Sequence, residues 1–148
     1  MHVTRELDVA VPPPQLWKTL WDVPRTVSCL PGCVEAREVE PNRRYAARMT
    51  QRIGPITLSV PLEVTITNVV EPTSLALEAK GRDPVLGANV AMSVTLDVTP
   101  RQTGSRIRIE ADGKILGKLG ALGHGMIQRK GEELIDEFGA RLRRVVEG

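Results

Sequence analysis

Apolar and polar residues alternate with a period of two along most of this chain. In the longest such run, residues 56–67, the apolar side chains all fall on one face and Thr, Ser, Pro and Glu on the other. Alternation of this kind is typical of an antiparallel strand with one dry face and one wet face. The same pattern recurs, more weakly in the second range, over residues 3–11, 34–39, 44–52, 75–80, 90–98 and 106–113. The sequence therefore predicts a seven-stranded antiparallel sheet within one domain, residues 1–148.

Pro61 lies inside the longest of these runs, on its polar face. Proline has no N–H to donate to a neighbouring strand, so we expect a bend or a bulge at this position. A strand that bends near its middle lets the sheet curl. The sequence therefore predicts a curved sheet.

Helical signals occur at two places. Residues 12–14 are three prolines that lead into residues 15–22, where short helices are expected after the first strand because proline suits a first helical turn. Residues 116–146 are apolar at helical spacing. Only this last helix is long enough to cover one face of the sheet, so the predicted fold class is α+β with a helix-grip arrangement.

Composition excludes several classes of protein. The net charge of +2 and the scattered basic residues argue against nucleic-acid binding. We expect no membrane-spanning segment and no signal peptide. Cys29 and Cys33 are expected to be reduced thiols, and with only His2 and His124 to assist them we expect neither a metal site nor a cofactor.

Glycines are unusually frequent on the side of the predicted last helix that faces the sheet: Gly117, Gly120, Gly123 and Gly131. Each costs about 1 kcal/mol relative to alanine in a helix interior, so something must offset the penalty. Either the glycines allow close packing of helix and sheet, or they leave a hollow for a ligand. Small residues on the dry face of the sheet favour the hollow: Ala47, Ala79, Ala111 and Gly113. An empty hollow of ~300 Å³ would cost about 7 kcal/mol, so one that large should collapse or be filled.

Strand parity and the helical wheel give the expected lining of this hollow. The residues are Tyr45, Ala47, Met49, Leu58, Val60, Leu62, Leu77, Ala79, Met92, Val94, Ile109, Ala111, Leu119, Leu122, Gly123, Met126 and Lys130. Almost none of them titrates, and no acid–base pair or activated nucleophile is visible. We therefore expect a binding protein, not an enzyme. Lys130 either hydrogen-bonds a carbonyl head group or extends to the rim.

Several short motifs resemble those of one known family. They are residues 9–14 with Trp17 behind them, residues 29–35 (Cys-Leu-Pro-Gly-Cys-Val-Glu), residues 53–56, residues 71–72 and residues 117–119. With these motifs the chain resembles the CoxG family (carbon monoxide dehydrogenase G subunit) of the START-like SRPBCC superfamily, over nearly its whole length. The resemblance implies a helix-grip fold, no catalytic residue, and a role beside membrane-linked molybdenum hydroxylases in membrane attachment and quinone or lipid carriage.

Three functional hypotheses follow. The first is a cytoplasmic quinone or lipid carrier for a molybdenum hydroxylase such as carbon monoxide dehydrogenase, with peripheral contact at the inner face of the membrane as a further option. The second is an assembly or docking factor for a dehydrogenase complex, without ligand transport. The third is a cyclase- or hydratase-like enzyme that uses Lys130. The basic residues of 44–52 and 141–144 fit either contact with anionic lipid or an ordinary solvated face.

Overall fold

The computed structural model describes residues 1–117 and 122–148. Along the described chain the elements are β1 (His2–Val9), α1 (Pro13–Trp21), α2 (Val23–Val27), β2 (Cys33–Glu40), β3 (Arg44–Ile53), β4 (Ile56–Val70), β5 (Ser74–Asp83), β6 (Ala88–Arg101), β7 (Gly104–Leu116) and α3 (His124–Glu147). The predicted order of a strand, two short helices, six strands and a long helix is confirmed.

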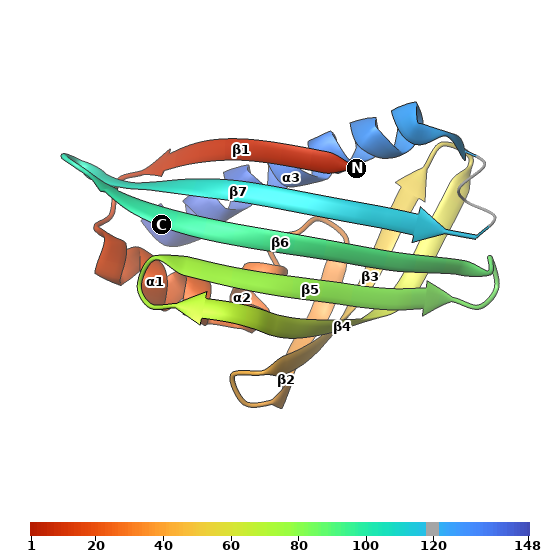
Figure 1. The fold of residues 1–148 in the computed structure, drawn as a ribbon, viewed down its shortest axis with the longest axis horizontal. Helices are drawn as coiled ribbons and strands as arrows, with labels where there is room; N and C mark the ends of the chain where they lie inside the picture. Colours follow the sequence, from red (N-terminus) through yellow and green to blue (C-terminus); the bar gives the residue numbers. More distant parts are fainter. Residues whose placement is uncertain (118–121) are drawn as a thin grey trace.

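The strands of the described chain form one seven-stranded sheet in the order β1-β7-β6-β5-β4-β3-β2, and every neighbouring pair is antiparallel. Figure 1 shows the sheet strongly curved, with β3 and the start of β4 crossing steeply to the direction of β5, β6 and β7. The long helix α3 lies behind β1, β7 and β6 in this view, on the concave side. The predicted helix-grip fold is therefore present.

The strand β4 pairs with β3 from its start but with β5 only in its second part, and Pro61 and Asp83 lie where this change occurs. Its pairing with β3 continues through Pro61 without a shift, but its pairing with β5 begins only at Leu62. Beyond that point the carboxylate of Asp83 accepts the backbone N–H of Ser59 at 3.2 Å, in place of a ladder partner. The bulge expected at Pro61 occurs instead between Ile66 and Asn68, while Pro61 marks where β4 leaves β5 and the sheet curls.

The last helix begins later than its apolar spacing predicts. The segment expected to be helical from residue 116 is still strand at Leu116, and α3 starts at His124. Gly117 and Gly123 have φ of +104° and +85°, values that other residues rarely adopt, so they end β7 and precede the helix instead of lying within it. Gly120 and Leu119 lie outside the described residues.

The two halves of α3 pack differently. All of its buried residues lie from Gly131 onward, and the fully buried Leu142 and Ile135 anchor that half to the sheet. Polar contacts add to this anchor, because the Arg5 guanidinium donates to Asp136 at 2.7 Å. The first turns of α3 bury none of their residues fully, but the Gln128 amide ties them to β1 by donating to the His2 carbonyl at 2.9 Å and accepting the His2 N–H at 3.2 Å. Within residues 1–117 and 122–148, none of the helices combines the length and the apolar character needed to cross a bilayer.

Candidate ligand-binding site

Two small hollows lie between the concave face of the sheet and α3. The first, called here the inner chamber, has a volume of about 60 Å³. It is enclosed by the α2 segment, by β4, β5 and β6, and by α3. Its lining residues are Thr26, Val27, Leu30, Cys33, Leu62, Val64, Leu77, Ala79, Met92, Val94, Leu96, Ile135 and Phe138.

The second hollow, called here the outer chamber, has a volume of about 70 Å³ and lies under the first half of α3. It includes the polar side chains of Gln51, Lys114 and Lys130 among an otherwise apolar lining. The other lining residues are Met1, Leu30, Met49, Ile53, Leu58, Val90, Ala91, Met92, Gly113, Ile115, Ile127, Gly131 and Leu134. Leu30 and Met92 line both chambers.

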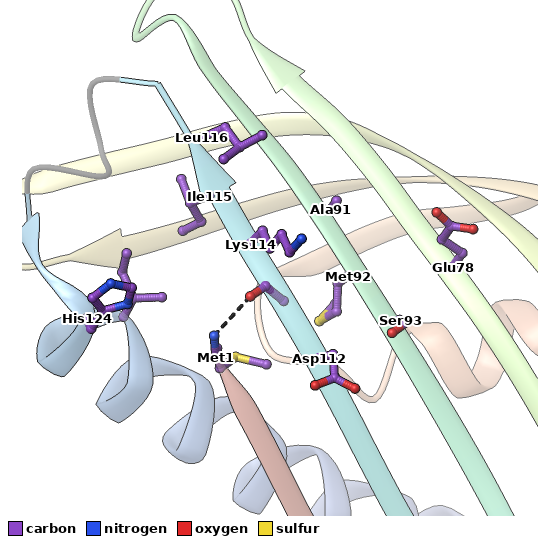
Figure 2. Close-up of a pocket in the computed structure, with 12 residues that line it drawn as sticks. Met1, Glu78, Ala91, Met92, Ser93, Asp112, Lys114, Ile115, Leu116 and His124 are labelled. Atoms are coloured by element: carbon purple, nitrogen blue, oxygen red, sulfur yellow. Dashed lines mark hydrogen bonds between the residues drawn. The ribbon is translucent and has the colours of Figure 1, made fainter.

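A wider hollow of about 600 Å³, called here the mouth, lies around the open end of β7. It shares Met1, Met92 and Ile127 with the outer chamber and continues onto the outer face of the sheet, where Glu78 and Ser93 line it. Figure 2 shows it around the end of β7, with Met1 and His124 on the α3 side and Ser93 and Glu78 on the side of β6 and β5. It exists because β1 pairs with β7 only as far as Asp112, so the last residues of β7 have no strand beside them on this edge.

The glycines expected to create the hollow contribute less space than predicted. A side chain at Gly131 would collide with the Met1 side chain, which also lies 3.3 Å from where a Cβ of Gly113 would be. Met1 therefore fills the space between β7 and α3 that these two glycines leave. The hollow is consequently two small chambers, and at about 24 cal/mol per Å³ each costs only about 1.5 kcal/mol while empty.

The structure places part of the expected lining around these chambers. Around the inner chamber lie Leu62, Leu77, Ala79, Met92 and Val94. Around the outer chamber lie Met49, Leu58, Met92 and Lys130.

The other expected residues of the described chain line neither chamber: Tyr45, Ala47, Val60, Ile109, Ala111, Leu122, Gly123 and Met126. Ile109 lies 3.7 Å from where a Cβ of Gly139 would be, under the tightly packed half of α3. Met126 instead covers the turn at Gly54. Gly123 precedes the helix, and no atom lies within 4 Å of the place a Cβ would take there.

Sequence reasoning missed one whole wall of the site. The residues of this wall run from α2 through the turn after it to the first residue of β2, and no strand or helix period assigns them to the interior: Thr26, Val27, Leu30 and Cys33. Phe138 could have been found, because it lies on the apolar stripe of α3.

Polar groups at the site are few and mostly engaged. The Thr26 hydroxyl donates to the carbonyl of Leu20 at 3.0 Å, and the Gln51 amide donates to the carbonyl of Pro31 at 2.5 Å. Burial raises the pKa of the Cys33 thiol to about 11, so this group stays neutral at physiological pH. Lys130 makes no hydrogen bond or ion pair with any other described residue. The arrangement can hold an apolar molecule and offer the cationic donors Lys114 and Lys130 at the outer chamber.

A separate group on the outer face of the sheet could offer ligands to a metal. His2, Glu110 and Asp112 hold their ligand atoms within 4.8 Å of one another, and His2 Nδ1 lies 2.6 Å from Asp112 Oδ1. His2 and Asp112 are exposed and Glu110 is half-buried. The hydrogen bond between His2 and Asp112 accounts for their closeness without a metal.

Comparison with known proteins decides the family. Residues 6–147, which are nearly the whole chain, match the family described as the G subunit of carbon monoxide dehydrogenase (CoxG). The chain belongs to the CoxG family. No curated protein matches this CoxG-family chain significantly.

Solved structures share the fold of this CoxG-family protein at low sequence identity. A conserved protein from Geobacillus kaustophilus has a TM-score of 0.81 and 19% identity, over 98% of this chain and 93% of that one. A protein from Thermus thermophilus has a TM-score of 0.72 and 14% identity, over 99% and 97%. A START superfamily protein from Mycobacterium smegmatis has a TM-score of 0.73 and 9% identity, over 98% and 96%. These similarities establish the START-like fold.

Proposed function

We propose that this CoxG-family protein is a non-enzymatic accessory protein that binds a quinone or another apolar lipid between its sheet and α3. The observation that carries the proposal is the inner chamber, whose lining is aliphatic or aromatic apart from Thr26 and Cys33. Neither group carries a charge: a threonine hydroxyl does not ionise, and burial raises the pKa of the Cys33 thiol. The Thr26 hydroxyl is also bonded to backbone carbonyls. Such a lining favours a ligand held by burial of apolar area, at about 25 cal/mol per Å².

The protein served by this carrier is proposed from the family. The CoxG family carries the name of a carbon monoxide dehydrogenase subunit, so we propose a molybdenum hydroxylase of this kind as the partner. A carrier of quinone beside such an enzyme would deliver or remove its electron acceptor at the inner face of the membrane. Contact with the membrane surface would then be peripheral and transient.

The empty chambers are small for such a ligand. A cavity of ~150 Å³ holds one benzene molecule, and each chamber here has less than half that volume. Binding therefore requires side chains to move. The half-buried start of α3 and the mouth beside it are where such movement disturbs the fewest contacts.

The test is binding of a 1,4-naphthoquinone by the purified protein, together with native mass spectrometry for a co-purifying lipid. Ala79 lines the inner chamber, so Ala79→Leu fills it and should weaken binding at least tenfold. Ala76→Leu is the matched control, because position 76 is three residues away on the same strand and on the opposite face of the sheet. Equal affinity of the two variants, or no binding by the unmodified protein, would contradict the proposal.

A docking role without transport is the second candidate, and one observation favours it. The strand β2 forms an edge of the sheet, and its Val34 and Val39 are 54% and 56% exposed. An exposed edge strand with apolar side chains is a surface on which another chain can pair. If docking is the function, Val34→Lys with Val39→Lys should abolish binding to the dehydrogenase, and Ala79→Leu should leave it intact.

A further inference from the structure

Met92 occupies a singular position among the three hollows. It is the one described residue that lines the inner chamber, the outer chamber and the mouth alike. Its register partners are Ala79 on β5 and Gly113 on β7. Directly opposite residues normally support each other through side chains ~5 Å apart, but these two offer a methyl group and a hydrogen atom. Met92 therefore has only the methyl group of Ala79 beside it on β5, while on β7 the flexible side chain of Met1 lies over Gly113.

Leu30 faces the same boundary from the other wall. It lines both chambers, and it is buried, with 8% of its surface exposed. Its backbone is held in consecutive turns, because its N–H donates to the carbonyl of Val27 at 3.0 Å and its carbonyl accepts the N–H of Cys33 at 3.1 Å. Leu30 is thus the fixed side of the boundary between the chambers.

Methionine is suited to be the movable side. Its unbranched side chain has three rotatable bonds and adapts to gaps of different shape. Met92 is only half-buried although it faces the interior, which leaves it room to turn. A change of its rotamer needs no movement of the sheet.

We propose that Met92 is the movable partition of the ligand site: when it turns aside, the outer chamber and the inner chamber become one continuous path. The inference rests on the proposed function and specifies its ligand. The ligand has an apolar end that passes Met92 into the inner chamber and an oxygen-bearing end that stays in the outer chamber. Lys130, which is free of other described partners, donates to that oxygen, whereas the inner chamber offers only the Thr26 hydroxyl, which is already bonded to backbone carbonyls, and the weak S–H donor of Cys33.

The first experiment measures affinity for 2-alkyl-1,4-naphthoquinones from methyl to hexyl. In the unmodified protein each methylene that passes the partition should raise affinity about fourfold, from about 0.8 kcal/mol per buried CH₂. In Met92→Phe the rigid ring should block the passage, so that affinity hardly changes with chain length. Met92→Leu should restore the dependence. An unchanged dependence in Met92→Phe overturns the proposal.

The second experiment does not depend on quinone binding. Met92→Ala removes Cγ, Sδ and Cε from the partition and should join the chambers, so that the variant binds n-butylbenzene, seen as a rise in Tm. Met49→Ala removes the same atoms from the outer chamber alone and should not bind it. If Met92→Ala and Met49→Ala respond alike, the partition is not at Met92. Failure of the proposed function has a different signature: no naphthoquinone of any chain length binds the unmodified protein, whatever n-butylbenzene does.

Discussion

Removal of the Phe138 ring is the sharpest test of where the inner chamber lies. Phe138 is 6% exposed and forms the α3 side of that chamber. Losing the buried ring costs about 2 kcal/mol in transfer free energy. The freed volume of about 100 Å³ adds about 2.4 kcal/mol at the slope observed for core cavities. Phe138→Ala should therefore lower the free energy of unfolding by about 4 kcal/mol.

The same substitution should create a binding site for benzene. The freed volume joins a chamber of about 60 Å³, and the result matches the ~150 Å³ cavity known to hold one benzene molecule. Urea unfolding followed by circular dichroism measures the loss of stability. Benzene at ten times its Kd should then restore about 1.4 kcal/mol to Phe138→Ala and nothing to the unmodified protein. A loss below about 1 kcal/mol, or no response to benzene, would refute this placement of the chamber.

Other predictions concern pH and the glycines. Hydrogen bonds from the backbone N–H groups of Leu86, Ser59 and Val85 hold the pKa of Asp83 below its ordinary value. The stabilising effect of the Asp83 carboxylate is therefore present above pH ~4 and is lost as the pH falls through its folded-state pKa. The urea midpoints of Asp83→Asn and the unmodified protein should therefore differ at pH 7 and converge near pH 2. Burial raises the pKa of the Cys33 thiol to about 11. The stabilisation that the folded protein gains from keeping this thiol neutral is therefore complete below pH ~9 and is lost between pH ~9 and about 11. In Cys33→Ala the loss of stability between pH ~9 and about 11 should be smaller than in the unmodified protein. In the unmodified protein, iodoacetamide at pH 8 should modify Cys33 far more slowly in the folded state than in urea. Gly117→Ala should destabilise by about 2 kcal/mol or more, because φ is +104° and a Cβ would collide with the carbonyl of Gly87. Gly125→Ala, which lies in α3 with open space around it, should instead raise the free energy of unfolding by up to about 1 kcal/mol. The same sign for both glycine variants would contradict this reasoning.

The fold was predictable because period-two alternation is a local property. Each strand reveals its dry face through side chains two residues apart, so Leu58 and Leu62 could be assigned to the interior without knowing what covers them. The start of α3 was not predictable in the same way. Leucine–glycine triplets have helical spacing, but Gly117 and Gly123 adopt positive φ, which spacing does not reveal.

The sequence by itself determined the curved antiparallel sheet, the covering helix and the apolar character of the space between them, because these depend on the order of apolar and polar residues. Only the tertiary structure decided how that space is divided. Met1 fills the gap between Gly113 and Gly131, although 112 and 130 residues separate it from them along the chain. Leu30 lines the same two chambers as Met92, from a turn with no periodic pattern. Volume is set by atoms brought together from distant parts of the chain, so no local pattern can report it.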